Sequence, residues 1–360
     1  MGQAIPRESE AKISQRRVRH QSRRAGESCR GSWRVNGSGL SNLASKRIAI
    51  TGGTGFVGGH LIDRLVSEGA QVRALARNPA KLGSRADAVD IITGDLGDAD
   101  ALGALAAGCD AVIHLAAMTH ALSRDDFRAA NVEGTARVAT AAASAGALLV
   151  HISSIAARAP DLSDYAWSKA ESEKAVASTY AEQAQEGAPG WICLRAPAIY
   201  GPGDEATLPY FKMVKLGIAP EPMMSPPGRA SFLYVDDVIA AIISSMSTQA
   251  GRIYEIGDES PEGHSWAEIG IALGAAFGKR PFALKAPRPL LEVQAGIAEG
   301  IAHLRNEPTF VTRGKIAEFF HPDWVARDGL LSDATDWHPT TPLEEGFAKT
   351  LKWYQEEGLL

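Results

Sequence analysis

A glycine-rich turn near residue 50 constrains the fold of this chain more than any other feature. Residues 47–51 are typical of a buried strand, and the helix that follows repeats its apolar residues on one face. Between them, three glycines stand three residues apart, where they permit a tight turn and let backbone amides approach a pyrophosphate. A structural loop could share this spacing, but its place between strand and helix favours a dinucleotide site. The residues predicted to hold the cofactor here are Gly52, Gly55, Phe56, Val57 and Gly58.

Short β-branched or apolar runs alternate with helical patterns from residue 46 to residue 200. Alternation of this kind implies right-handed βαβ crossovers and a parallel sheet that helices cover on both faces. We therefore predict an α/β fold with a Rossmann-type, doubly wound parallel sheet. The predicted strands span residues 47–51, 72–75, 90–92, 111–115, 148–152 and 191–194, and helices between them span residues 99–107, 131–145 and 164–185.

This regular alternation loosens after Tyr200, where glycine and proline become frequent. Later helices are predicted over residues 238–247, 265–277 and 342–357, and they suit a smaller C-terminal substrate lobe. The predicted organisation is therefore a disordered basic extension over residues 1–45, an NAD(P)-binding Rossmann domain over 46–200 that also receives later segments around 230–257, and a region over 201–360 that is mainly substrate lobe.

Charge is distributed unevenly along the chain. Residues 1–45 hold nine Lys/Arg and three Asp/Glu, which leaves 28 basic and 39 acidic residues of the 37 and 42 in the whole chain. An acidic body argues against nucleic acid as a ligand, because phosphate contacts need clustered Lys/Arg. The basic stretch has few large apolar residues, so we expect disorder there, as a basic arm, a transit peptide or an extension without a role.

Apolar runs and cysteines restrict the class of protein further. No apolar run approaches the roughly 18 residues that a membrane-spanning helix needs. Cys29, Cys109 and Cys193 are scattered and lack C-x-x-C spacing, which argues against a disulfide framework or a structural zinc site. We therefore expect a cytoplasmic protein without a bound metal ion that acts on a small-molecule substrate.

Two positions near strand ends bear on the choice of cofactor. At the end of the second predicted strand, an acidic residue would normally bind the ribose hydroxyls of NAD. Arg77 stands there instead and is placed to pair with a 2′-phosphate, which favours NADP over NAD, although a solvated arginine explains it nearly as well. After the third strand, Asp95 would accept a hydrogen bond from an adenine amino group while Leu96 packs on the ring; alternatively, Asp95 caps a helix.

Tyr165 and Lys169 give the strongest chemical signal, because they stand four residues apart on a predicted helix with Ser154 at a strand end upstream. Four residues make about one turn, so both side chains share a face. A free tyrosine has a pKa of ~10, and a nearby ammonium would lower the pKa of Tyr165 by roughly 2–3. We predict that Tyr165 is the acid/base, that Lys169 also holds the nicotinamide ribose, and that Ser154 binds the reacting oxygen.

In their order along the chain, these segments resemble the extended short-chain dehydrogenase/reductase family, specifically its NAD-dependent epimerase/dehydratase and 3β-hydroxysteroid dehydrogenase-like members. The resemblance runs from about residue 46 to the C-terminus. It implies a seven-stranded Rossmann sheet with a C-terminal substrate lobe, and a homodimer is in keeping with it. Besides the glycine turn and the Tyr/Lys pair, it rests on residues 94–96, 114–117, 131–135, 153–154, 194–203, 232–238, 337–339 and 343–346.

The resemblance also implies roles for individual residues. Ser154, Tyr165 and Lys169 would form the catalytic triad. Asn131 would be a supporting polar residue, for which the alternative is a helix N-cap before Val132. Along the cofactor the resemblance places Leu115, Ala116 and Ala117 at a strand end, and Pro197 and Ile199 beside the nicotinamide amide.

Departures from the family pattern bear on the substrate. The interval from Ser154 to Tyr165 is 11 residues, shorter than in typical nucleotide-sugar enzymes, and Arg229 stands one position from the arginine that binds their diphosphate. We therefore predict an NADP(H)- or NAD(H)-dependent oxidoreductase that moves hydride between the cofactor and a secondary alcohol or ketone. A nucleotide-sugar epimerase or dehydratase with retained NAD is the nearest alternative, and a non-catalytic NADP-binding sensor or accessory subunit is the third.

Overall fold

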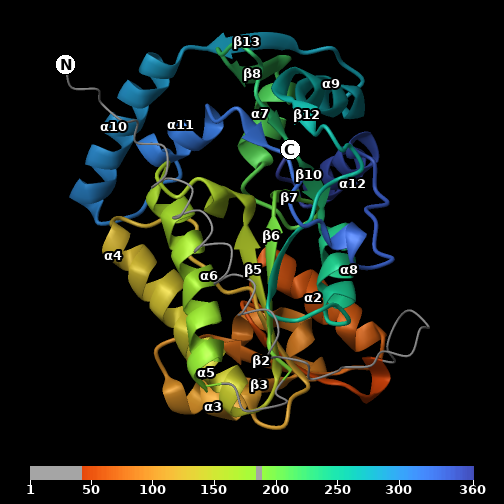
Figure 1. The fold of residues 1–360 in the computed structure, drawn as a ribbon. Helices are drawn as coiled ribbons and strands as arrows, with labels where there is room; N and C mark the ends of the chain where they lie inside the picture. The colour runs from red at the N-terminus through yellow and green to blue at the C-terminus, as the bar shows by residue number, and fades with distance from the viewer. Residues whose placement is uncertain (1–42, 184–188) are drawn as a thin grey trace, which may run out of the picture.

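A seven-stranded parallel β-sheet forms the centre of the molecule (Figure 1). The computed structural model describes residues 43–183 and 189–360. The strands lie in the order β11-β6-β5-β4-β1-β2-β3, and each neighbouring pair is parallel. This arrangement confirms the predicted Rossmann-type α/β fold. The strands are β1 (Arg47–Thr51), β2 (Gln71–Ala76), β3 (Asp90–Thr93), β4 (Ala111–His114), β5 (Leu148–Ser154), β6 (Trp191–Ala196) and β11 (Arg252–Glu255).

Helices cover both faces of this sheet (Figure 1). α3 (Ala99–Ala106), α5 (Gly134–Ser144) and α6 (Asp164–Gln183) pack on one face, and α2 (Phe56–Ser67) and α8 (Val235–Ser245) pack on the other. Strands covered in this way are apolar on both sides, as parallel sheets generally are. The core between α2, α8 and the sheet contains Leu61, Ile62, Val238 and Ile242, and the core on the other face contains Leu102, Leu105, Val138 and Val176.

The order of the strands reverses at β1, which pairs with β2 on one side and with β4 on the other. In open α/β sheets, ligands bind in the crevice beyond the carboxyl ends of the strands at such a reversal. Thr51, the last residue of β1, is in register with His114, the last residue of β4. The fold therefore places the glycine turn and the loop after β4 on either side of this crevice.

The strands of the Rossmann half lie where the sequence predicts them. β1 has the predicted limits, and β2 to β6 begin and end within two residues of the prediction. α2 ends just before Gly69, which has a φ of +80°, in the left-handed region that favours glycine. α6 begins at the predicted Asp164, whereas residues 184–185 of its predicted end lie outside the described part of the chain.

The helix predicted over residues 131–145 begins earlier than expected. Ser123 caps α4 (Arg124–Phe127) in a reciprocal capping box with Asp126, and a π-helical turn, η3 (Arg128–Glu133), then continues into α5. Asn131 therefore lies inside a continuous helical segment, and the alternative that it caps a helix before Val132 is wrong. π-Helical turns of this kind are frequent at functional sites.

The C-terminal lobe has a core of its own, which Phe211, Leu273, Phe347 and Tyr354 fill. The predicted later helices are present as α8, α9 and α12, each within three residues of its predicted start. The helices of this lobe are α7 (Leu208–Lys215), α9 (Trp266–Ala276), α10 (Arg288–Arg305), α11 (Arg313–Phe319) and α12 (Leu343–Glu356). Small sheets join β7 (Ala198–Tyr200) to β10 (Phe232–Tyr234), β8 (Ile218–Pro222) to β13 (Phe282–Ala286), and β9 (Arg229–Ala230) to β12 (His264–Ser265) and β14 (Asp323–Trp324).

Several expectations concern segments outside these elements. The basic extension and Cys29 lie outside the described residues, except that Leu43–Ser45 form a 3₁₀ turn, η1, in which Leu43 is buried. Cys109 and Cys193 are both free and buried. Among the helices of the described chain, none combines the length and apolar character that crossing a membrane requires. The remaining 3₁₀ turns are η2 (Pro79–Ala88), η4 (Ile155–Arg158) and η5 (Leu331–Asp333).

Candidate active site

The glycine turn after β1 leaves no room for a side chain at Gly52 or at Gly58. Gly52 has a φ of +79°, and a Cβ atom there would lie 2.6 Å from the backbone nitrogen of Ala116. A Cβ atom on Gly58 would lie 2.1 Å from the carbonyl oxygen of Gly52. Gly55 is the N-cap of α2, and no side chain caps the amides of the first turn. These amides are left for an anion at the positive end of the helix, so this turn fits the pyrophosphate of a dinucleotide.

The other residues predicted along the cofactor lie at the same edge of the sheet. Leu115 and Ala116 are half-buried in the loop after β4, and Ala117 is exposed next to them. Leu96, after β3, packs against α5, where it lies 3.0 Å from the position of a Cβ on Gly134. Phe56 and Val57 begin α2, Pro197 is buried after β6, and Ile199 lies in β7. The fold thus brings these residues together at the crevice, and their contacts with a cofactor stay a prediction.

Arg77 and Asp95 are both exposed at strand ends. Arg77 directly follows β2 and has no ion-pair partner among the described residues. Asp95 accepts a hydrogen bond from the backbone nitrogen of Gly97 at 2.7 Å, whereas the N-cap of α3 is Asp98, which accepts from Ala101. The alternative that Asp95 caps this helix is therefore wrong, and both side chains are accessible to a ligand.

Tyr165, Lys169 and Ser154 converge where α6 begins beside the end of β5. Lys169 is buried, and its ammonium donates a hydrogen bond to the carbonyl of Ile152 at 2.8 Å. Ser154 ends β5, where its hydroxyl accepts from the backbone nitrogen of Ala156 and lies close enough to the phenol of Tyr165 to lower its pKa. The structure therefore brings together the three side chains that the sequence assigned to catalysis.

The pKa of the Tyr165 phenol differs from the expectation. Burial raises the pKa of Tyr165 to about 12, and this effect outweighs the hydrogen bond from Ser154, which lowers it. Burial also lowers the pKa of Lys169 to about 8, although the Glu173 carboxylate opposes this. The expected lowering of the Tyr165 pKa by Lys169 is thus wrong for the chain as described, because the ammonium is directed at a backbone carbonyl. At neutral pH the phenol keeps its proton.

Asn131 holds the first turn of α6 against the loop after β4. Its amide nitrogen donates to the carbonyl of Met118 at 2.8 Å and to the hydroxyl of Ser168 at 2.9 Å, and its amide oxygen accepts from the nitrogen of Met118 at 2.7 Å. Ser168 in turn donates to the carbonyl of Tyr165 at 2.8 Å. Asn131 is buried, so it acts on the site through these bonds, which fix the backbone that carries Tyr165.

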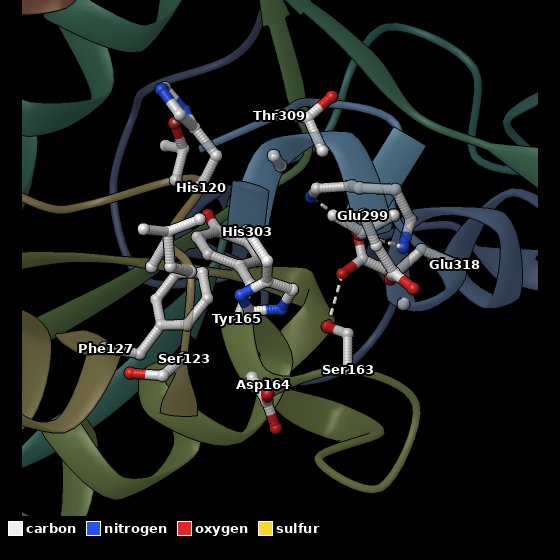
Figure 2. Close-up of a pocket in the computed structure, with 17 residues that line it drawn as sticks. His120, Ser123, Phe127, Ser163, Asp164, Tyr165, Glu299, His303, Thr309 and Glu318 are labelled. Carbon is white, nitrogen blue, oxygen red and sulfur yellow. Dashed lines mark hydrogen bonds and ion pairs between the residues drawn. The ribbon is translucent and has the colours of Figure 1, made fainter. Parts of the chain in front are cut away.

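A pocket opens in front of Tyr165, between α4, α6 and the two C-terminal helices α10 and α11 (Figure 2). Lys315 of α11 lies over the Tyr165 ring, with its ammonium 4.3 Å from the ring centre, and it pairs with Glu318 at 2.7 Å. Glu318 also accepts a short hydrogen bond from Ser163, the residue before α6. On the α10 side, Glu299 and His303 line the same pocket.

The sequence did not lead us to predict α10 or α11, and so it identified none of the pocket residues that these two helices carry. The signal for α10 was available, since large aliphatic residues recur along it at helical spacing. Nothing in the local sequence indicated that Lys315 or Glu318 would face Tyr165, because their position depends on how the C-terminal lobe docks on the Rossmann half.

A buried charged network lies behind Ser154, Tyr165 and Lys169. Ser153, unlike its neighbour Ser154, donates a 2.6 Å hydrogen bond to Glu173 of α6. Arg195 of β6 binds the same carboxylate with two nitrogens, at 2.9 and 2.7 Å, and lies 3.8 Å from Glu255 of β11. Glu255 also pairs with Arg158 and accepts from two backbone amides. This network joins β5, β6, β11 and α6 beneath the site.

Two buried histidines stack beside the crevice, with the rings of His114 and His151 5.2 Å apart. The Thr135 hydroxyl donates to the carbonyl of Asn131, so it accepts from Nε2 of His114 at 2.9 Å. Nδ1 then accepts from the Thr51 hydroxyl at 2.6 Å, which assigns the neutral tautomer with its proton on Nε2. Burial lowers the pKa of His114 to about 3 and that of His151 well below its usual value.

Acid should therefore destabilise the fold through His114. Above pH 6.5 the histidine is neutral in both states, and between pH 6.5 and about 3 only the unfolded chain takes up the proton. From pH 7 to pH 5 we expect His114 alone to cost about 2 kcal/mol of unfolding free energy. Urea unfolding at both pH values measures this, and a His114→Gln variant should lose less stability on acidification than the wild type. An equal loss in both proteins would contradict the expectation.

The comparison with protein families decides the classification. The model of the NAD dependent epimerase/dehydratase family matches residues 48–257. The chain belongs to this family. It is therefore an enzyme of the extended short-chain dehydrogenase/reductase type, as its motifs implied, with the NAD-dependent oxidoreductase, epimerase and dehydratase chemistry of that family.

Individual relatives extend the similarity beyond the family model. The chain is 33% identical to a ceramide reductase from Caulobacter vibrioides, over 87% of this chain and 96% of that protein. It is 28% identical to a decarboxylating sterol-4-alpha-carboxylate 3-dehydrogenase from Schizosaccharomyces pombe, over 85% and 96%. Among solved structures, MoeE5 in complex with UDP-glucuronic acid and NAD covers 87% of this chain and all of its own, with a TM-score of 0.66 and 21% identity. At this identity, that likeness shows the fold.

Proposed function

We propose that this enzyme reduces a ketone to a secondary alcohol with NADPH or NADH, and that Tyr165 donates the proton. The observation that carries the proposal is the position of Tyr165, which lines a pocket beside Ser154 and lies one helical turn from Lys169. A phenol that keeps its proton at neutral pH suits the direction of reduction, because the substrate oxygen must receive a proton there.

The chain would supply the proton and the orientation for this reaction. A reduced nicotinamide dinucleotide, held at the glycine turn, would supply the hydride for the carbonyl carbon. Tyr165 gives its phenolic proton to the carbonyl oxygen, so that hydride and proton together convert C=O into CH–OH. The Ser154 hydroxyl would donate to that same oxygen, and Lys169 would hold the nicotinamide ribose. Asn131 serves as a positioning residue through its bonds to Met118 and Ser168.

We assign the substrate to the class of apolar, lipid-like ketones. Support comes from two relatives that align over nearly their whole length, one a ceramide reductase and the other a sterol carboxylate dehydrogenase. Arg229 gives separate support, because it is held by the carbonyls of Glu262 and Gly263 at 2.7 Å and by Glu268 at 3.2 Å. An arginine whose guanidinium is already bound by residues of the 262–268 segment is not free to bind the diphosphate of a nucleotide sugar.

Turnover assays test the proposed reaction. Purified protein is first titrated with NADPH and NADH by fluorescence, and then offered long-chain ketones, a 3-ketosteroid and UDP-sugars while the reduced-nicotinamide absorbance is followed. Stoichiometric loss of the reduced cofactor with an apolar ketone is the expected result. UDP-sugar conversion without net change in the cofactor would instead identify an epimerase. Tight cofactor binding without turnover of any substrate would identify a sensor.

The preference for NADP depends on Arg77. Replacing Arg77 with Gln removes the exposed guanidinium at the end of β2, which we expect to pair with the 2′-phosphate. A charge-assisted contact of this kind is worth about 1.5–3 kcal/mol, so NADPH affinity should fall roughly tenfold to a hundredfold. NADH affinity should stay the same and serves as the internal control. If both affinities were unchanged, Arg77 would be a solvated side chain without a role in binding.

A further inference from the structure

Five large aliphatic side chains project from one face of α10 into solvent. Their exposed fractions range from 46% to 88%, although residues of this kind are usually buried in a folded protein. With about 100° of rotation per residue, all five fall within about 80° of the helix circumference. On the opposite face, Ala295 and Ala302 are buried against the lobe. The five, hereafter the α10 stripe, are Leu290, Val293, Ile297, Ile301 and Leu304.

The segments on either side of α10 add to this apolar surface. Phe282 and Leu284 are exposed on β13, just before the helix, and Phe310 and Val311 are exposed in the loop just after it. Figure 1 shows α10 and β13 at the outer edge of the C-terminal lobe, where α10 packs against α11 and β13 pairs with β8. Contiguous exposed apolar surface of this extent marks an interaction site.

Basic residues surround the α10 stripe. Residues 279–313 hold six Lys/Arg and three Asp/Glu, whereas the rest of residues 46–360 holds 22 basic and 36 acidic residues. All six cations are exposed. Among the ion pairs of the described residues, Arg288 joins Glu292 and Arg313 joins Glu299, whereas Arg280, Lys285 and Arg305 join none. This apolar surface is thus also positively charged, whereas the rest of residues 46–360 is acidic.

We propose that the α10 stripe and its basic surroundings dock onto the surface of an anionic phospholipid bilayer. An amphipathic helix lies in such an interface with its large apolar residues among the acyl chains and its Lys/Arg at the anionic headgroups. Docking from one face also fits a chain in which no described helix can span a membrane.

A second copy of the chain fits this surface less well. A two-fold dimer brings the same patch of both subunits together. The unpaired cations Arg280, Lys285 and Arg305 would then meet their own counterparts, and like charges across an interface oppose association. An anionic membrane instead supplies negative charge next to a hydrophobic interior.

The docked helix would connect the membrane to the catalytic pocket. Glu299, Ala302 and His303 of α10 line the pocket that contains Tyr165, so the α10 stripe and the pocket lie on opposite sides of one helix. A bilayer against this helix therefore lies within a helix diameter, about 10 Å, of the pocket wall. Delivery of a lipid ketone by this route rests on the proposed function, whereas membrane docking does not.

Co-sedimentation with vesicles tests the docking directly. Full-length protein is mixed with vesicles of phosphatidylcholine and phosphatidylglycerol, or of phosphatidylcholine alone. We expect binding to the anionic vesicles that weakens at high salt, because salt screens the headgroup attraction. A Val293→Gln/Ile297→Gln variant should bind roughly tenfold or more weakly, because two stripe residues no longer favour the acyl region. Ile271→Gln on α9, where Ile271 is 55% exposed, is the matched control and should bind like the wild type.

Several outcomes would overturn the proposal. It fails if the wild type binds neither kind of vesicle. It also fails if the Val293→Gln/Ile297→Gln variant binds as tightly as the wild type, because the binding site would then lie elsewhere, for example in basic residues 1–45. The surface would instead belong to a second copy of the chain if the wild type is a dimer in solution that does not bind vesicles, and if the Val293→Gln/Ile297→Gln variant is a monomer. Thermal unfolding of each variant checks that the exposed substitutions leave the fold intact. Because vesicle binding needs no substrate, its failure is distinguishable from failure of the proposed reduction.

Discussion

Tyr165→Phe should lower turnover by about 10²- to 10⁴-fold while leaving cofactor affinity unchanged. The substitution removes only the hydroxyl, and a positioned proton donor contributes a rate factor of about that size. Cofactor affinity should persist because the glycine turn and Lys169 are untouched, and the ring would keep its packing against Phe127 and below the Lys315 ammonium. Steady-state turnover of a ketone and fluorescence titration of NADPH measure the two effects separately.

Tyr180→Phe provides the matched control for this variant. Tyr180 lies on the same helix, α6, but its hydroxyl donates to the carbonyl of Ala147 at 3.1 Å, away from the pocket. Its loss should cost some stability and leave turnover near that of the wild type. If Tyr165→Phe kept most of its turnover, or if Tyr180→Phe lost as much, then the phenol of Tyr165 would not be the proton donor.

The Rossmann half of the molecule could be predicted closely, because its signals are local. A strand, a turn of three glycines and an amphipathic helix occupy adjacent residues, and the packing of the turn confirms why glycine is needed at Gly52 and Gly58. The Tyr165 and Lys169 pair could also be recognised in the sequence, because one helical turn separates the two residues. What such spacing could not supply was the direction of the Lys169 side chain, which donates to Ile152 and leaves burial to set the pKa of Tyr165.

The C-terminal lobe was predicted less well, for physical reasons that α10 illustrates. Its apolar residues follow a helical period, but Pro287 and Pro289 precede them and Gly296 and Gly300 interrupt them, and both residue types disfavour helix interiors. The prolines in fact stand at the N-cap and in the first turn, where a helix tolerates them. The pocket residues of α11 depend on contacts between segments more than 150 positions apart, such as Ser163 with Glu318, which no local pattern encodes.

Arg195→Leu should be among the most destabilising single substitutions in the chain. Glu173 and Glu255 are almost fully buried, and Arg195 is the cation that lies between them. Without the guanidinium, the Glu173 carboxylate keeps only the hydrogen bond from Ser153 and the charge of Lys169 nearby. Removing one partner of a buried pair costs about 3–5 kcal/mol, because an uncompensated charge stays in the interior. Urea unfolding at pH 7 measures the loss.

Two further variants distinguish the cost of leaving a charge uncompensated in the interior from the cost of losing a salt bridge. In Glu173→Leu/Arg195→Leu no charge of the pair is left buried, so the double variant should recover part of the stability that Arg195→Leu loses. Arg85→Leu breaks a pair with the same two-nitrogen geometry, to Asp63 at 2.8 and 2.7 Å, but in an exposed position. It should cost less than about 1 kcal/mol. If Arg195→Leu and Arg85→Leu cost the same, burial would not be the reason that the network beneath the site matters.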